Sequence, residues 1–578
     1  MKKLLLIILC LPIFIYSQTN ISGIINNNQV WTISGSPYII TNNVLITTGA
    51  ELQINPGVII KFNSGNSLQV QGVLKAHGSS TNKIIFTSND SLPSSGDWGV
   101  IEFMDQTIDA SYDTLGQYID GSCIINTNIR YGGGFSAQGA VKITNSAVYL
   151  DNVLVTNSDS KGIFINKSTG GTVPNIKIKN SEIINNNDAG IYCDCYQYNV
   201  SIEIDSSFIS DNIGDGISTG SGDAGGSHNF IFTNNTITNN NTGITAHANG
   251  SQNIFNNIIN GNYANGIRLR GNGVYNVQNN IITNNLSVGI HGIYATHFIN
   301  QNIIAGNGGG IEISQGGDYT ITNNLIYDNN NGGDGSAIDT YGGTSQSAWS
   351  PPININGNTI TNNISVSAAI LAFDPDNGTP PFLLNHNNIH NNDSPFAIKN
   401  YRDINVNNID ATYNFWGDTL ASYIDTKIYD WFDNNTRSIV YYNPYIFNIN
   451  VQNPISPPTN VVKYILGDVE VSWDSNIESD VIGYKIHFGN YNGYSFANTI
   501  DVGNITTYNL AGLVTQLDSV VAVTAYDSLA DGINDQIEGH ESWYSLAFVI
   551  GCTDSAAVNS DAGIDQTICS GDSVTLNA

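Results

Sequence analysis

The stretch Asn280-Ile-Ile-Thr-Asn-Asn285-Leu-Ser-Val-Gly289-Ile290 decides the fold, because it is one copy of a phrase that recurs between Glu182 and Tyr401. The phrase is Asn-x-Ile-x-x-Asn followed by Gly-Ile or Ala-Ile. Successive copies are 22 to 34 residues apart, counted on Ile184, Ile209, Ile237, Ile259, Ile282, Ile304, Ile326, Ile360 and Ile389. Periods in this range are typical of a solenoid, in which each copy buries its apolar face against its neighbours.

The apolar runs in these copies are short, β-branched and separated by Asn and Gly. A helical repeat needs helix-spaced apolar residues over ten or more positions and disfavours this much Asn and Gly. A leucine-rich repeat needs several leucines per copy, where this chain has isoleucine. We therefore expect coils of short parallel strands, stacked about 4.8 Å apart. A column of stacked turn asparagines should satisfy its own amides and tolerate left-handed backbone, and it comprises Asn235, Asn257, Asn280, Asn302, Asn324, Asn358 and Asn387.

These residues resemble the right-handed parallel β-helix family, the pectin-lyase-like fold, from roughly Val44 to Tyr445. The predicted fold class is all-β, with a β-helix and its capping segment over residues 18–455. Asn414-Phe-Trp416-Gly417 resembles the closing segment of secreted β-helices, so Trp416, Trp431 and Phe432 are predicted to cover the last coil. The fold hosts many functions and does not by itself imply one.

The 578 residues carry 48 acidic and 19 basic side chains, a formal net charge of −29. This balance argues against nucleic acid and anionic membrane surfaces as partners. It is compatible with calcium, although simple solubility explains it equally. With only 12% charged residues, the surface is mostly amide and hydroxyl, which suits hydrogen bonding to sugars.

Residues 1–17 resemble a secretory signal peptide, because Lys2 and Lys3 precede an apolar run too short for a stable membrane span. We expect an exported protein, secreted or at the outer cell surface. Cys193 and Cys195 should face the core as thiols, with a metal site as the alternative. Cys552 and Cys569 form a candidate disulfide, which export permits.

The pattern changes after Pro454–Pro458, which we interpret as a linker. Residues 456–550 contain seven short strand candidates and Trp473, and they resemble a fibronectin type III domain. Residues 551–578 resemble the first strands of an immunoglobulin-like repeat from surface proteins of Bacteroidetes type, and they stop after two strands. This part predicts a spacer or binding module without catalytic chemistry.

Alternation along the strands assigns the outward side chains. If the Ile after each Gly or Ala points inward, two outward columns follow, which contain Tyr192, Asp194, His247, Arg268, Arg270, His291, Glu312, Asp339 and Tyr341. Arg268 and Arg270 share one strand, with His247 one coil before it and His291 one coil after it. In a chain poor in Lys and Arg, such a basic cluster is a candidate site.

A uronate polymer across the coils would present carboxylates to Arg268 and Arg270. A lyase or epimerase also needs a base for the neighbouring C–H proton, for which His247 or His291 would serve. Tyr192, Asp194, Glu312, Asp339 and Tyr341 would contact substrate, and Glu312, Asp339 and Asp194 are candidate calcium ligands. Surface ion pairing is the structural alternative for the same residues.

Enzyme motifs of the family are incomplete. Asp215-Gly-Ile matches a fragment of the polygalacturonase-type set, but Gly-His-Gly is absent; Phe373-Asp374-Pro375-Asp376 lacks the His and Glu of the alginate epimerase motif. The sequence therefore favours a β-helix that binds an extracellular polysaccharide or mediates adhesion. A uronate lyase or epimerase and a purely structural stalk are the alternatives.

Overall fold

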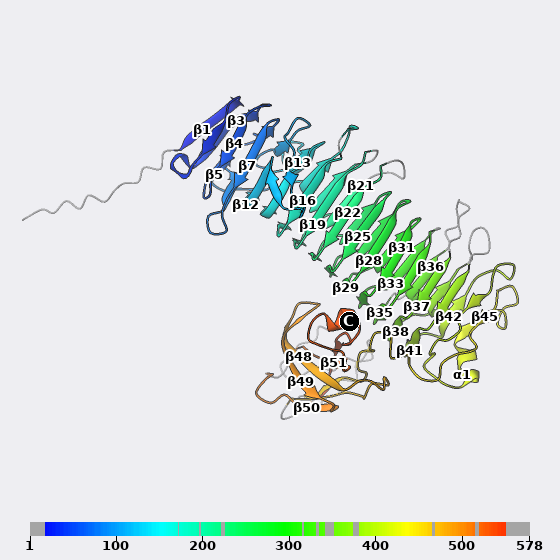
Figure 1. Ribbon diagram of the computed structural model, residues 1–578. Helices are drawn as coiled ribbons and strands as arrows, with labels where there is room; N and C mark the ends of the chain where they lie inside the picture. The colour runs from blue at the N-terminus through cyan, green and yellow to red at the C-terminus, as the bar shows by residue number, and fades with distance from the viewer. Residues whose placement is uncertain are drawn as a thin grey trace, which may run out of the picture. The chain divides into compact units, whose positions relative to one another are not determined.

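Parallel strands dominate the computed structural model, which describes residues 18–171, 173–195, 198–220, 226–314, 317–330, 335–341, 352–373, 381–464, 469–514 and 520–550 (Figure 1). The proposed signal peptide, the immunoglobulin-like start and both cysteines of the candidate disulfide lie outside these residues. Helices are few in the described ranges: η1 (Ile33–Gly35), α1 (Ala421–Thr426) and α2 (Asp535–Glu538). Within the described residues, no helix has the length and apolar character needed to span a bilayer.

The chain divides into two compact units, Met1–Ile231 and Phe232–Ala578, with β22 (Asn229–Thr233) at the division. In the first unit, parallel strands form three series. One series contains β1 (Thr19–Ile25), β3 (Tyr38–Ile46), β5 (Ile59–Phe62), β8 (Ile84–Ser88), β12 (Cys123–Arg130), β14 (Tyr149–Thr156), β17 (Glu182–Ile184) and β20 (Phe208–Ser210). The second contains β2 (Gln29–Trp31), β4 (Glu51–Ile54), β7 (Val73–His77), β16 (Asn175–Lys179) and β19 (Ser201–Asp205), with the first halves of β12 and β14. The third contains β6 (Leu68–Val70), β9 (Ile101–Phe103), β13 (Gly139–Thr144), β15 (Lys161–Asn166), β18 (Ile191–Asp194) and β21 (Ile217–Gly220), with the second half of β3.

Three details of the first unit refine the sequence-based description. Residues 104–135 include the coil strand β12 and the antiparallel hairpin β10 (Ser111–Tyr112) and β11 (Tyr118–Asp120). Solenoid strands begin at Thr19, inside the predicted β-helix range of residues 18–455 and ahead of the resemblance that starts near Val44. In the earliest copy the inward residue is Ile183, which pairs with Ile209, and not Ile184.

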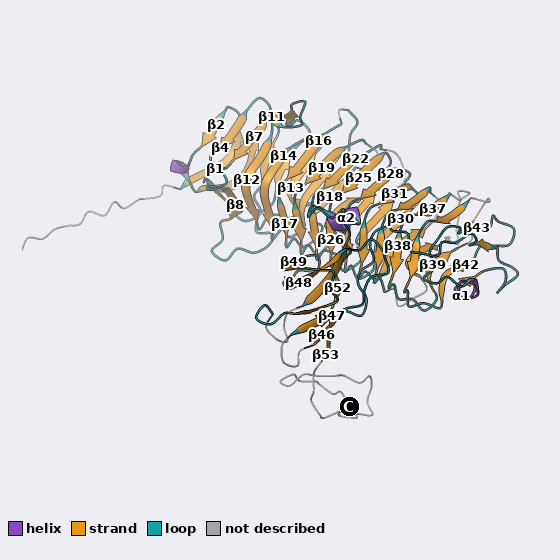
Figure 2. Ribbon diagram, turned by 60° about the horizontal axis from the view of Figure 1, so that its bottom comes forward, coloured by secondary structure: helices purple, strands orange, loops and turns teal. Residues whose placement is uncertain are grey.

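In the second unit, the coil strands form three parallel sheets, named here A, B and C (Figure 2). Sheet A contains β25 (Ser251–Phe255), β28 (Val274–Gln278), β31 (Thr296–Asn300), β34 (Tyr319–Thr322), β37 (Ile353–Asn356), β40 (Phe382–Asn385), β43 (Ile409–Asp410) and β45 (Val440–Tyr441). Sheet B contains β23 (Thr236–Thr238), β26 (Ile258–Asn260), β29 (Ile281–Thr283), β32 (Ile303–Ala305), β35 (Leu325–Tyr327), β38 (Thr359–Thr361) and β41 (Asn388–His390). Sheet C contains β24 (Ile244–His247), β27 (Ile267–Arg270), β30 (Val288–Ile293), β33 (Gly309–Ser314), β36 (Gly335–Tyr341), β39 (Ala368–Ala372), β42 (Phe396–Asn400) and β44 (Ile428–Tyr429).

The predicted asparagine column exists and forms a buried ladder. The Asn280 amide donates to the Asn302 Oδ1 atom at 3.0 Å and to the carbonyls of Ile254 and Gln278. A second ladder runs through Asn240, Asn262, Asn285, Asn307, Asn329, Asn363 and Asn392. The left-handed backbone belongs to the residue before each ladder position, as at Asn279 with φ 57°, and not to the ladder asparagine itself.

The residue before each inward isoleucine of sheet C is small because the next coil passes close to it. A Cβ atom added to Gly266 would lie 2.7 Å from the carbonyl oxygen of Gly289 in the next coil. Later copies carry alanine at this place, at Ala337, Ala369 and Ala397. The Gly/Ala-Ile phrase therefore keeps neighbouring coils close together while its isoleucine fills the core.

Aromatic rings stack inside the sheet A side of the core. Tyr275, His297 and Tyr319 occupy the same position on three successive strands, and the His297 ring lies 5.4 Å from that of Tyr275 and 4.6 Å from that of Tyr319. The predicted core thiols are also buried: Cys193 lies on the inward side of β18 in the first unit, and Cys195 directly follows that strand.

The closing segment follows the predicted plan in part. Asn414 takes the last place of the first ladder, since its Oδ1 atom accepts from the Asn387 backbone and amide. Trp416 is buried, as expected for a residue that covers the last coil. Phe432 is 80% exposed, so the prediction that Phe432 covers the last coil is wrong. Phe432 instead packs edge-on against Trp431 at the surface.

Residues 456–550 form two four-stranded sheets, which we call the C-terminal module. One sheet has the order β50 (Thr507–Asn509), β47 (Glu470–Ser472), β46 (Val462–Tyr464), β53 (Phe548–Ile550). The other has the order β49 (Phe496–Gly503), β48 (Gly483–Tyr491), β51 (Val521–Tyr526), β52 (Ser545–Leu546). Both sheets contribute to one apolar core that contains Trp473, the tryptophan singled out in the sequence. The fibronectin type III assignment stays a prediction.

The C-terminal module packs on sheet B within the second unit. Trp543 of the module joins Ile303, Ala305, Leu325 and Tyr327 of the coils in one buried cluster. The expected linker at residues 454–458 is packed into this contact: the Thr359 hydroxyl donates to the Pro454 carbonyl at 2.6 Å, and the His390 Nε2 atom lies 3.0 Å from the Ser456 hydroxyl.

Candidate functional site

The candidate site lies on the outer surface of sheet C. Strand register aligns Thr245, Arg268, His291, Glu312 and Asp339 as direct neighbours on five successive strands, β24, β27, β30, β33 and β36. Neighbouring strands in a sheet lie about 4.8 Å apart, so these side chains form a continuous line. We call this line the Arg268 row, and it has the order that the alternation rule predicts.

The core side of the same strands explains why the row faces outward. The preceding residues Ile267, Ile290, Ile311 and Ile338 are buried, and successive side chains of a strand point to opposite faces. Arg268 is exposed, while His291, Glu312 and Asp339 are half-buried. The row is therefore accessible from outside the coil.

A second column runs beside the Arg268 row. His247 pairs with Arg270 in register, and both side chains are half-buried. The next member, Ile293, is buried, which separates these two residues from Ser314 and from the backbone of Tyr341. The structure therefore brings His247 and Arg270 together at one end of the second column; the Tyr341 side chain lies outside the described structure.

His291 is held by one neighbour in the second column and one in the row. Its Nε2 atom lies 2.9 Å from the Ser314 hydroxyl and 3.6 Å from a carboxylate oxygen of Glu312. Burial lowers the pKa of His291, the Glu312 carboxylate opposes that shift, and the positive charge of Arg268 adds to it. The imidazole is therefore neutral near pH 7 and able to accept a proton.

Arg268 differs from His291 and Glu312, which contact each other within the row. Across the residues that the structure describes, its guanidinium takes part in no hydrogen bond or ion pair, although Glu312 is two coils away and His291 is adjacent. The polar contact between His291 and Glu312, at 3.6 Å, does not include Arg268. Arg268 thus presents an exposed planar donor group to solvent.

Tyr192 and Asp194, predicted as substrate contacts, lie on β18 in the first unit. The Tyr192 ring stacks on Phe164 with centroids 6.0 Å apart, and the Lys161 ammonium lies 5.1 Å from the Tyr192 centroid. Asp194 is exposed. Tyr192 and Asp194 therefore belong to the first unit, whereas the Arg268 row belongs to the second.

The sequence suggests two candidate metal sites, one at Cys193 and Cys195 and a calcium site with Glu312, Asp339 and Asp194 as ligands. Throughout those ranges, no group of three or more His, Cys, Asp or Glu side chains is arranged to hold a metal ion. Burial raises the pKa of Cys193, while a hydrogen bond from Cys193 and the nearby His228 lower the pKa of Cys195 to about 6. Glu312 and Asp339, two of the candidate calcium ligands, remain direct neighbours in the row.

Sequence reasoning missed the outer surface of sheet B, which meets the C-terminal module. Its signal was present: Asn280-Ile-Ile, Asn302-Ile-Ile and Asn324-Leu-Ile each place two apolar residues in succession. A strand with one solvated face should alternate apolar and polar residues, so such pairs indicate that both faces are covered.

Two family models match the chain. Residues 243–410 match the model described as "Right handed beta helix region", and residues 23–141 match "Pectate-lyase like beta helix domain". The chain contains a right-handed, pectate-lyase-like β-helix. The sequence-based fold prediction is confirmed in this respect.

Similar solved structures include β-helical enzymes at low identity. The periplasmic alginate epimerase AlgG is 13% identical with a TM-score of 0.34, covering 70% of this chain and 78% of that one. The A-module of the Azotobacter vinelandii mannuronan C-5 epimerase AlgE6 is 12% identical with a TM-score of 0.33, covering 66% and 92%. Pectate lyase Pel9A is 14% identical with a TM-score of 0.24, covering 57% and 78%.

Among curated proteins, the Drosophila melanogaster protein bark beetle is 36% identical over 66 residues. The matched stretch spans 11% of this chain and 2% of that protein.

Proposed function

We propose that the β-helix is an exported, cell-surface domain that binds a uronate-containing polysaccharide along the Arg268 row. The observation that carries this proposal is the exposed Arg268 guanidinium without a protein partner among the described residues, placed in line with His291, Glu312 and Asp339. A planar guanidinium binds a carboxylate through two parallel hydrogen bonds. The acidic members of the row, one and two coils beyond His291, supply acceptors for sugar hydroxyls.

A second candidate function, uronate lyase or epimerase, is favoured by the position of His291. A guanidinium on the substrate carboxylate would make the adjacent C–H more acidic, and the neutral His291 imidazole in the next coil would take that proton. In a lyase the released electron pair forms a C=C bond and expels the glycosidic oxygen of the next sugar. In an epimerase a proton returns to the opposite face of the same carbon.

The remaining parts of the chain fit a surface protein in this proposal. The C-terminal module would be a fibronectin type III-like spacer, and the chain would come from a protein of Bacteroidetes type. A purely structural stalk is the outcome if neither binding nor turnover is found.

Binding and turnover are tested on the same protein with polygalacturonate and alginate. Titration calorimetry measures affinity, and far-ultraviolet absorbance of the unsaturated product measures lyase activity; proton exchange from the polymer measures epimerisation. We expect Arg268→Ala to weaken binding at least tenfold and Arg268→Lys to restore only part of it, because lysine lacks the planar fork.

A matched control is Lys142→Ala. This substitution removes one positive charge, as Arg268→Ala does. The Lys142 ammonium, however, is already paired with Glu102 at 3.0 Å on the neighbouring strand. The proposal would be overturned if, for each polymer, Arg268→Ala bound with the same affinity as the parent protein. If turnover is detected, His291→Ala should abolish it while leaving binding within a few-fold of the parent.

A further inference from the structure

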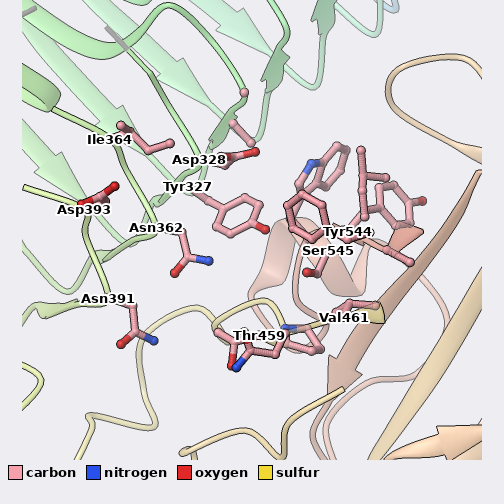
Figure 3. A pocket seen from close by; sticks show the side chains of 18 of the residues that line it. Tyr327, Asp328, Asn362, Ile364, Asn391, Asp393, Thr459, Val461, Tyr544 and Ser545 are labelled. Carbon is pink, nitrogen blue, oxygen red and sulfur yellow. The ribbon is translucent and has the colours of Figure 1, made fainter. Parts of the chain in front are cut away.

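A pocket of about 700 Å³ lies between sheet B and the C-terminal module, within the second unit (Figure 3). Its coil side consists of turn residues that directly follow successive sheet B strands, Asn284, Gly306, Asp328, Asn362 and Asn391. Each residue comes from a different coil, so these positions repeat at about the 4.8 Å strand spacing, with a polar side chain at all of them except Gly306.

The facing wall is aromatic. Half-buried Tyr491 and Tyr544 of the module supply its ring surfaces, whereas Trp543 of the module and Tyr327 of the coils line it as buried residues. Trp543 and Tyr544 pack with ring centroids 4.7 Å apart, and Figure 3 shows Tyr327 directed between Asn362 and Ser545. Rings with amphipathic edges and faces suit the C–H faces of sugars, and amides suit their hydroxyls.

The charges of the pocket select among ligands. Asp328 and Asp393 are exposed at its rim, and the lining contains no Lys, Arg or His. Within the described part of the chain, neither carboxylate accepts a side-chain hydrogen bond or ion pair. Carboxylate oxygens accept hydroxyl donors, and with no cation in the lining they repel uronates. The Arg268 row also contains carboxylates but has a guanidinium beside them, so the two sites differ in the sugars that they favour.

We infer that this pocket binds a short neutral oligosaccharide, with its rings stacked on the module aromatics and its hydroxyls bonded to the turn residues of the coils. The site is distinct from the Arg268 row, which lies on sheet C. The inference does not depend on the proposed uronate binding.

The backbone at the coil side allows a mild test. Asp328, Asn362 and Asn391 have positive φ values of 52°, 57° and 53°, and Gly306 occupies the equivalent place in its own coil with φ 66°. Glycine therefore removes each polar side chain without backbone strain. The test variant is Asn362→Gly with Asn391→Gly, and a second variant is Tyr544→Leu.

The control is Asn323→Gly. Asn323 has φ 55°, and Gly357 holds the same turn position one coil later, but Asn323 does not line the pocket. Binding of cellohexaose, laminarihexaose, maltohexaose and chitohexaose to the whole protein is measured by titration calorimetry, with hexagalacturonate as the acidic comparison.

We expect at least one neutral hexasaccharide to bind to the parent protein. Its affinity should be at least tenfold weaker in the double glycine variant and in Tyr544→Leu. The affinity should be unchanged in Asn323→Gly and Arg268→Ala. No saturation by any of the four at millimolar concentration would overturn the inference, as would affinity that the pocket variants leave unchanged. Loss in Arg268→Ala alone would assign the binding to sheet C instead.

Discussion

Among single residues, His297 makes the clearest prediction about acid stability. Its ring is fully buried between Tyr275 and Tyr319, and burial lowers its pKa to about 3. An unfolded histidine titrates near pH 6.5. The unfolded chain therefore binds a proton that the folded chain does not bind between these two values, and the free energy of unfolding falls as the pH drops from about 6.5 toward 3.

We expect His297→Phe to keep the stacked rings and to flatten this pH dependence. At pH 4.5, about two units below the unfolded pKa, the variant should gain roughly 3 kcal/mol of stability over the parent relative to their difference at pH 7.5, since one pKa unit corresponds to about 1.4 kcal/mol. Urea unfolding at several pH values measures the slope. His386→Asn is the control, because His386 is exposed and earlier coils carry Asn at the same turn position, as at Asn279 and Asn323. A slope that both variants leave unchanged would contradict the assignment.

At the scale of structural elements, the asparagine ladder should contribute more than its residues do singly. Asn280 is buried, donates three hydrogen bonds, and accepts from the backbone and amide of Asn257 through its Oδ1 atom. Asn280→Ala would leave several of these buried groups without partners, at a cost of about 1–3 kcal/mol for each unsatisfied group. We expect a total loss of roughly 3 kcal/mol in the free energy of unfolding.

Asn276→Ala in the same coil is the matched control. Asn276 points outward, is half-buried and makes one side-chain bond to Asn253 at 2.9 Å. Its loss should cost no more than about 1 kcal/mol. Equal denaturation midpoints for the two variants would show that the ladder adds nothing beyond an ordinary surface amide.

The elements also show what the sequence could and could not predict. The Gly-Ile phrase fixes which side chains face inward, so the order of Arg268, His291, Glu312 and Asp339 followed from alternation alone. The bond between His291 and Ser314 did not, because it depends on side-chain rotamers across two coils. The paired apolar residues of sheet B indicate that its outer face is covered, but no local pattern encodes that the C-terminal module covers it or that Tyr327 and Trp543 line one pocket.

On the scale of the whole second unit, the contact between coils and module implies coupled unfolding. Trp543 is 4% exposed in the cluster with Ile303, Leu325 and Tyr327, and His390 is buried beside Ser456. A Trp→Ala change at a buried site costs about 3–5 kcal/mol. Most of that loss should fall on the contact rather than on the module core, which is built around Trp473.

We therefore expect calorimetry to show the module melting together with the coils in the parent protein, and Trp543→Ala to release a separate module transition several degrees lower. Proteolysis within residues 454–458 should become faster in the same variant, because that segment is packed into the contact. Phe548→Ala is the control: Phe548 is apolar, lies at the same pocket and is 77% exposed, so its removal should leave the melting unchanged. If Trp543→Ala melts as the parent does and resists protease equally, the module is held by its linker and not by sheet B.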